Sequence, residues 1–147
     1  MASALSTCGL AQYEGNILHT LLSVLLLGEI TFHVQAEPQA DHTAVADDNV
    51  LWEAACSLGV AAAQLQRCLC YKNRSVQQRA EDIWTNLTLP AATQTRDALA
   101  RAVYQRLFDW LVCSLNSTQC ITSQHDSTGG LFIGVLDIFG FEALESN

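Results

Sequence analysis

The chain has 147 residues, a net charge of −8, and a composition in which half of the residues are hydrophobic. This length fits one domain or a piece of a larger one, and the apolar content excludes a wholly disordered chain. All seven Lys and Arg residues lie between Arg67 and Arg106. That stretch lacks the aromatic interleaving that stacking on bases requires, so we expect no nucleic-acid partner.

Residues 1–36 admit two interpretations. The apolar run Leu18–Leu27 has the character of a secretory signal core, and small residues follow it as a possible cleavage point. Asn73, Asn86 and Asn116 each begin an Asn-X-Ser/Thr motif for glycosylation, and six cysteines could form three disulfides. The alternative hypothesis is therefore a secreted, disulfide-bonded glycoprotein with an N-terminal signal peptide.

Other features of this segment favour a folded helix and strand. A signal peptide begins with positive charge, whereas residues 1–16 contain Glu14 and no Lys or Arg. The apolar run is shorter than the roughly 20 residues that span a bilayer, so we expect no membrane span. Residues 29–34 alternate between polar and apolar, and Gly28 can take the left-handed conformation that ends a helix. A helix followed by a strand is predicted over residues 13–34.

The next segment is predicted to be a loop followed by two helices. Residues 35–48 are polar and acidic, which indicates a surface loop. Asp47 or Asp48 can cap the helix that follows, and Gly59 can end it. A second short helix completes a helical pair over residues 49–70.

One long helix is predicted to dominate the second half. Two short extended pieces, around Ser75 and over residues 87–89, are expected before Pro90 breaks the second of them. The helix is predicted over residues 92–115, where an apolar side chain recurs every fourth residue. A polar connector is expected over residues 116–130.

Residues 131–136 form an uninterrupted apolar run. Such a run is typical of a strand covered on both faces in a parallel sheet, which needs helices on either side. Asp137, Gly140 and Glu142 follow its carboxyl end, where open α/β sheets place their ligand sites. The fold class predicted is therefore α/β, although Asp-x-x-Gly-x-Glu by itself is more often an ordinary exit from a strand.

Four segments carry a resemblance to a known family. Residues 132–142, Phe-Ile-Gly-Val-Leu-Asp-Ile-Phe-Gly-Phe-Glu, resemble the strand and switch II loop of the myosin motor domain. Residues 96–111 are similar to the helix that precedes that strand in the family, and residues 17–32 and 54–60 are similar to two segments further upstream. The resemblance implies an internal fragment of an unconventional myosin head that ends just after switch II. The implied fold is P-loop NTPase-like, with helices flanking part of a mixed sheet.

The resemblance also implies site residues for ATP and Mg²⁺. Asp137 would hold Mg²⁺ through a water molecule, since this ion keeps its waters and prefers oxygen ligands. The backbone N–H of Gly140 would reach the γ-phosphate, and Glu142 would pair with an arginine of switch I and help to position the attacking water. Ile138, Phe139 and Phe141 would anchor the moving loop in apolar pockets. Gly140 and Glu142 are thus the catalytic candidates, and residues 137–140 are the candidates for cofactor binding.

Activity and partners follow from the same resemblance. The 147 residues contain neither the glycine-rich phosphate loop with its lysine nor the switch I loop of the family. We therefore expect the chain to be inactive alone and to contribute to a myosin-type ATPase in an intact parent. The implied partners are the actin filament and the rest of the motor head, and the implied location is the cytoplasm and its cytoskeleton.

Overall fold

A computed structural model describes residues 2–36, 42–75 and 82–119. These residues form six helical segments, one of them a short 3-10 turn (η1), and four strands. In chain order they are α1 (Ala2–Thr7), η1 (Ala11–Tyr13), α2 (Glu14–Glu29), β1 (Phe32–Gln35), β2 (His42–Val45), α3 (Asp48–Leu58), α4 (Ala62–Cys70), β3 (Tyr71–Ser75), β4 (Asp82–Asn86) and α5 (Leu89–Gln119). This mixture of helices and strands agrees with the α/β class expected from the sequence. No helix in the described part is both long and apolar enough to cross a membrane.

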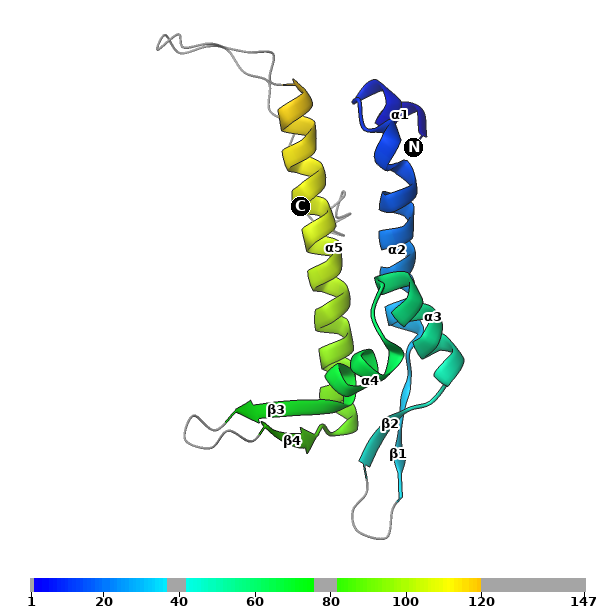
Figure 1. Ribbon diagram of the computed structural model, residues 1–147, viewed down its shortest axis with the longest axis vertical. Helices are drawn as coiled ribbons and strands as arrows, with labels where there is room; N and C mark the ends of the chain where they lie inside the picture. The colour runs from blue at the N-terminus through cyan, green and yellow to red at the C-terminus, as the bar shows by residue number, and fades with distance from the viewer. Residues whose placement is uncertain (1, 37–41, 76–81, 120–147) are drawn as a thin grey trace, which may run out of the picture.

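The two longest helices, α2 and α5, lie side by side and run in opposite directions (Figure 1). The 31 residues of α5 extend over about 46 Å at the usual helical rise. Its predicted apolar stripe is the better-covered side, because every member is half-buried: Leu99, Val103, Leu107, Leu111 and Leu115. By contrast, Arg101, Arg106 and Asp109 are exposed. The recurrence of an apolar residue at every fourth position thus explains which side of α5 faces the rest of the fold.

The buried side chains form two clusters at opposite ends of the α2–α5 pair. The cluster near the start of the chain contains Leu5, Leu10 and Ile17, with the leucines of the last turns of α5 packed against it. The larger cluster lies where α2 ends and joins α2, β2, α3 and α4. Its members are Leu27, Ile30, Val45, Leu51, Ala54, Ala55, Leu65, Leu69 and Cys70. Leu27, Ile30 and Leu69 are fully buried there, and each contributes about 1.5–3 kcal/mol through removal of its side chain from water.

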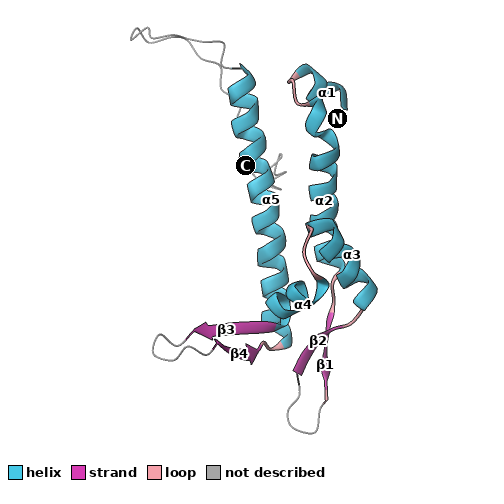
Figure 2. Ribbon diagram, in the orientation of Figure 1, coloured by secondary structure: helices cyan, strands magenta, loops and turns pink. Residues whose placement is uncertain are grey.

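The four strands pair as two separate antiparallel ribbons (Figure 2). In the first ribbon Phe32 lies opposite Val45 and Gln35 lies opposite His42. In the second ribbon, the β3–β4 hairpin, Tyr71 pairs with Asn86 and Ser75 pairs with Asp82. The strand expected over residues 131–136, and most of the connector before it, lie outside the described residues.

Strand β2 corrects the prediction that residues 35–48 form a surface loop. Thr43, Ala44 and Val45 are buried, and the last of these joins the larger core cluster. Pairing with β1 satisfies part of their backbone groups, the N–H of Thr43 points to Oδ1 of Asn86 instead, and burial of the apolar side chains offsets the acidic composition of the flanking residues. A strand of four residues was hidden by the average polarity of the segment.

The helix boundaries also differ from the sequence predictions in three places. Gly28 does not end α2, since the helix continues to Glu29 and Ile30 is the residue that caps it. Residues 87–89 are not a strand, because β4 ends at Asn86 and α5 begins at Leu89. Pro90 therefore lies in the first turn of α5, where its missing N–H would have had no helical partner in any case. At its other end α5 continues to Gln119, beyond the expected limit.

Helix α3 begins and ends at the two signals expected from the sequence. Asp47 is the N-cap, and its side chain accepts a hydrogen bond of 2.8 Å from the backbone N–H of Asn49. Gly59 follows the helix with φ of 69°, and its N–H bonds back to Ala55 and Cys56. A residue with a Cβ adopts this left-handed backbone conformation only at a cost in free energy, so glycine is favoured there.

The two glycines give opposite predictions for alanine substitution. Space is available at both positions, since an added Cβ would meet no atom within 4 Å at Gly28 or Gly59. Gly59→Ala should therefore lower the free energy of unfolding by about 1 kcal/mol through backbone strain alone. Gly28→Ala should raise it by about 0.5–1 kcal/mol, because Gly28 is helical and exposed. Urea denaturation of both variants measures this, and a loss of stability in Gly28→Ala would contradict the helical assignment.

Candidate functional site

The residues that the sequence predicts for nucleotide binding are not covered by the structure. Asp137, Ile138, Phe139, Gly140 and Glu142 all lie outside the described residues. Their predicted roles therefore stay predictions, and the structure neither brings them together nor separates them. What the structure does describe is the support that precedes them in the chain: a groove between α2 and α5, and a polar contact that ties the two helices together.

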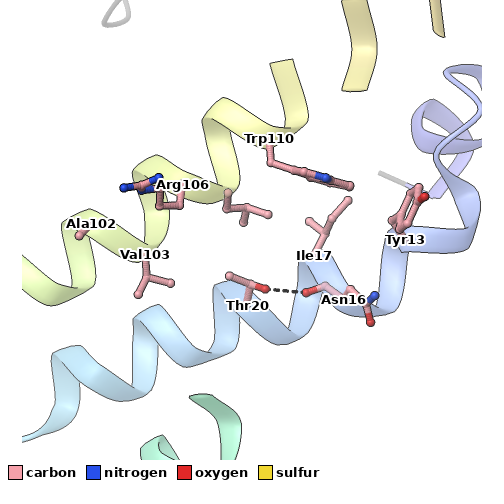
Figure 3. A pocket seen from close by; sticks show the side chains of 9 residues that line it. Tyr13, Asn16, Ile17, Thr20, Ala102, Val103, Arg106 and Trp110 are labelled. Atoms are coloured by element: carbon pink, nitrogen blue, oxygen red, sulfur yellow. Dashed lines mark hydrogen bonds between the residues drawn. The ribbon is translucent and has the colours of Figure 1, made fainter. Parts of the chain in front are cut away.

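The groove is an open hollow of about 610 Å³ between α2 and α5 (Figure 3). Its walls are mainly apolar, and they comprise Tyr13, Asn16, Ile17, Thr20, Ala102, Val103, Arg106, Leu107 and Trp110. The rings of Tyr13 and Trp110 meet edge to face at one end, with centroids 5.1 Å apart and an interplanar angle of 82°. An aromatic pair in this geometry contributes about 0.5–1.5 kcal/mol beyond burial of its area. This pair therefore helps to hold the far ends of the two helices together.

The polar groups in the groove do not form a catalytic arrangement. Thr20 uses its hydroxyl within its own helix, where Oγ1 donates to the carbonyl of Asn16 at 2.8 Å (Figure 3). Arg106 lines the groove without a carboxylate partner among the described residues. Within ranges 2–36, 42–75 and 82–119, no three His, Cys, Asp or Glu side chains gather as a metal site would require. The groove can bind an apolar surface, but it contains no nucleophile with an adjacent base.

The cysteines of the described part are free thiols. They are Cys8, Cys56, Cys68, Cys70 and Cys113. Cys70 is 1% exposed, and this burial raises the pKa of its thiol. The Cys70 thiol therefore stays protonated at neutral pH, which is typical of a packing residue and not of a nucleophile or metal ligand.

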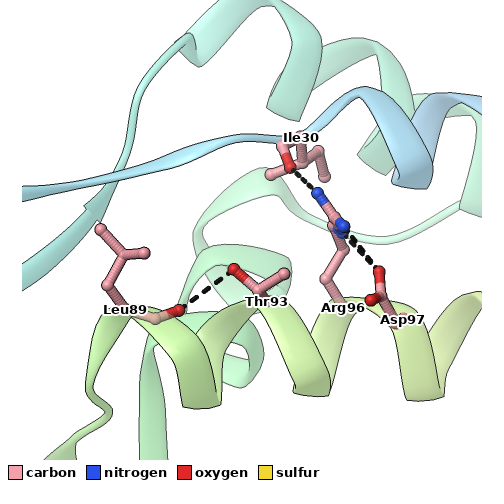
Figure 4. A network of polar contacts seen from close by, with 5 residues as sticks. All are labelled: Ile30, Leu89, Thr93, Arg96 and Asp97. Atoms are coloured by element: carbon pink, nitrogen blue, oxygen red, sulfur yellow. Dashed lines mark hydrogen bonds and ion pairs between the residues drawn. The ribbon is translucent and has the colours of Figure 1, made fainter.

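Arg96 forms the polar contact that joins the two helices at their other end (Figure 4). Its Nη1 donates to the backbone carbonyl of Ile30 at 2.6 Å, although the two residues are 66 positions apart. Its Nε and Nη2 both donate to Oδ1 of Asp97, at 2.9 and 2.6 Å. The side chain of Arg96 is only 16% exposed, which shields its bond to Ile30, whereas the side chain of Asp97 is 48% exposed.

The Arg96 contact lies at the C-terminus of α2. Ile30 caps the C-terminus of α2, where the partial negative charge of the helix dipole is concentrated. The last turn of α2 contains no basic residue of its own, and Glu29 adds a negative charge there. The guanidinium of Arg96, contributed by α5, satisfies a terminal carbonyl there, while Asp97 balances most of its positive charge. Sequence reasoning missed this contact because no local spacing relates the two residues.

Removing the Arg96 side chain should destabilise the fold. Arg96→Ala is expected to lower the free energy of unfolding by about 1–3 kcal/mol, since the charged hydrogen bond to the Ile30 carbonyl is lost and Asp97 loses its ion-pair partner. Arg96→Lys should recover part of this loss, because an ammonium group can still donate to the Ile30 carbonyl. Arg101→Ala, at an exposed position on the same helix, is the matched control. Equal urea midpoints for Arg96→Ala and Arg101→Ala would show that the Arg96 contact does not stabilise the fold.

Comparison with known proteins covers the whole chain. A family profile described as myosin head (motor domain) matches residues 1–147. The chain is 36% identical to the myosin IE heavy chain of Dictyostelium discoideum, over 100% of this chain and 15% of that relative. It is 37% identical to human myosin-IIIa, over 90% of this chain and 8% of the relative, and 33% identical to human unconventional myosin-Ib, over 99% and 12%. The chain therefore spans 15% or less of the length of these curated relatives.

Proposed function

Because the chain belongs to the myosin head (motor domain) family, we propose that it forms part of an actin-based motor head driven by ATP hydrolysis. The observation that carries the proposal is a match that extends over all 147 residues and so includes residues 132–142, which resemble switch II. The secreted glycoprotein is left without support, because the same match covers its supposed signal, Leu18–Leu27. In the structure that run lies within α2.

The described residues support a scaffolding role within the head. Helix α5 leads the chain toward residues 131–142 and is held against α2 at both ends, by aromatic packing and by the Arg96 contact. We propose that this antiparallel pair fixes the position from which the switch II segment begins. A segment that must respond to a γ-phosphate needs a rigid base, since catalysis of phosphoryl transfer depends on positioning.

Exposed apolar side chains indicate a large protein partner, which we take to be the rest of the motor head. On α2, Leu18, Leu22 and Leu25 are 46%, 47% and 68% exposed and follow one another at helical spacing. On α3, Trp52 is 61% exposed, and on α5, Tyr104 is 52% exposed. Apolar residues in such number mark interaction surfaces in soluble proteins. A cytoplasmic, cytoskeletal location with the actin filament as partner is proposed on the family assignment.

Residues 137–142, which follow the apolar run 131–136, would act on bound Mg·ATP. The donor chemistry fits, since the carboxylate of Asp137 suits an ion that keeps its waters and prefers oxygen. Bound Mg·ATP supplies the phosphoryl group that passes to water. The backbone N–H of Gly140 would donate to a γ-phosphate oxygen, and the absence of a Cβ permits that approach. Glu142 would pair with a switch I arginine and orient the attacking water, while Ile138 and Phe139 would anchor the loop.

The 147-residue chain alone should be inactive toward nucleotide. It contains no glycine-rich loop with a lysine to hold the phosphates, and its only lysine, Lys72, lies in β3. We expect no ATP hydrolysis, and binding of Mg·ATP no tighter than millimolar. Isothermal titration calorimetry of the purified chain measures this directly. Micromolar binding would show that the chain holds a nucleotide site of a different kind.

The predicted roles of Gly140 and Glu142 can be tested in a head chimera, in which these 147 residues replace the matching segment of Dictyostelium myosin IE heavy chain. Gly140→Ala and Glu142→Gln should leave nucleotide binding largely intact. Each should slow hydrolysis by about 10²–10³. In Gly140→Ala the added methyl group keeps the backbone N–H away from the γ-phosphate, and in Glu142→Gln a positioned charge is lost. Single-turnover kinetics separates binding from the chemical step.

Glu145→Gln is the matched control in the same chimera, since Glu145 lies three positions beyond Glu142 and carries no proposed role. It should hydrolyse ATP at the rate of the unsubstituted chimera. Hydrolysis at that same rate in both Gly140→Ala and Glu142→Gln would exclude these residues from the site.

A further inference from the structure

The β3–β4 hairpin is joined to the rest of the fold at a narrow base. Strand β3 begins at Tyr71, directly after Cys70 ends α4. The chain returns beside the same point, where the N–H of Leu87 donates to the carbonyl of Cys70 at 2.8 Å. The two strands pair with each other and with no other strand in the described part. Figure 1 shows the hairpin extending sideways from the lower end of α5.

A hairpin held this way needs another contact to fix its direction. A side-chain contact to β2 is long, since the N–H of Thr43 lies 3.4 Å from Oδ1 of Asn86. A hydrogen bond at this distance is weak. Because Asn86 is also the last residue of β4, this contact acts close to the base and restrains rotation poorly.

Arg67 and Trp84 make the contact that is placed to restrain the hairpin. The guanidinium carbon of Arg67 lies 3.7 Å from the centroid of the Trp84 ring. Arg67 is on α4, one turn before its end, and Trp84 lies in β4 opposite Asn73. The contact therefore joins helix and hairpin at a point away from the base. A guanidinium stacked on an indole face is favourable through the ring quadrupole.

The indole of Trp84 has no hydrogen bond within the described part of the chain that could hold it there. Its Nε1 is buried and has no hydrogen-bond partner among the described residues, which makes this position costly for an indole. Hollows border the Arg67–Trp84 contact, one lined by Ala63, Gln66 and Tyr71 and another by side chains that include Leu65 and Leu99. Trp84 therefore borders open space on these sides, and the stack on Arg67 is the specific contact that it makes with α4.

We propose that Arg67 and Trp84 form a latch that sets the direction of the β3–β4 hairpin relative to α4. With the latch closed, the hairpin and α4 move as one unit. With the latch open, the hairpin is attached only at its base and can rotate about the junction between Cys70 and Tyr71. This inference concerns residues 62–75 and 82–86 alone and does not depend on the nucleotide role proposed above.

Hydrogen–deuterium exchange of the full 147-residue chain tests the latch. Arg67→Gln should accelerate exchange of the hairpin amides, residues 71–75 and 82–86, by roughly two- to fivefold, the range expected for an exposed cation–π contact. Arg67→Lys should accelerate it less, since a cation remains over the ring. The amides of the β1–β2 ribbon report on the rest of the fold, and Arg101→Gln controls for the loss of charge.

A double-mutant cycle with Trp84→Leu makes the test specific. In the Trp84→Leu background, Arg67→Gln should have no further effect on hairpin exchange. The proposal is overturned if the arginine substitution acts equally in both backgrounds, or if exchange in the β1–β2 ribbon rises as much as in the hairpin. If Trp84→Leu does not fold, Arg67→Gln and Arg67→Lys decide the matter, and equal effects of the two overturn the latch.

Discussion

The antiparallel packing of α2 on α5 is the constraint on which the rest of the described structure depends. It brings together residues far apart in sequence: the start of the chain meets the last turns of α5, and the end of α2 meets its first turns. Apolar contacts hold both ends. Edge-to-face packing of Tyr13 on Trp110 adds to them at one end, and at the other the Arg96 guanidinium donates to the carbonyl that follows α2. Both ribbons, together with α3 and α4, are arranged around that second end.

This arrangement explains how much of the fold could be predicted. Several local signals were reliable, since the apolar stripe of α5, the cap at Asp47 and the left-handed Gly59 depend only on neighbouring residues. Two others were not, because Gly28 does not end α2 and residues 87–89 do not form a strand. Long-range features were not predictable. Strand β2 is defined by its partner in β1, and Arg96 acts on a carbonyl 66 positions earlier. No composition window or helical period contains such information, because it arises only when the chain closes on itself.

The candidate site shows the opposite balance. Residues 132–142 form a motif that is long and of low degeneracy, and the resemblance that they carry was confirmed by a family match over residues 1–147. Physical reasoning from spacing gave only a strand followed by Asp137, Gly140 and Glu142 at its carboxyl end. The chemistry assigned to these residues comes from the family. The described residues contribute the packed α2–α5 pair, a groove without catalytic groups and a hairpin that is stacked on α4 through Arg67 and Trp84.

The central claim is that this segment works as part of an ATP-driven motor head that acts on actin. Co-sedimentation of the head chimera with actin filaments, with and without Mg·ATP, tests it most directly. The account predicts that the chimera sediments with filaments in the absence of nucleotide, that Mg·ATP releases it, and that filaments accelerate its hydrolysis of ATP. A chimera that folds and binds Mg·ATP, yet neither leaves the filament nor hydrolyses ATP faster in its presence, would contradict the account.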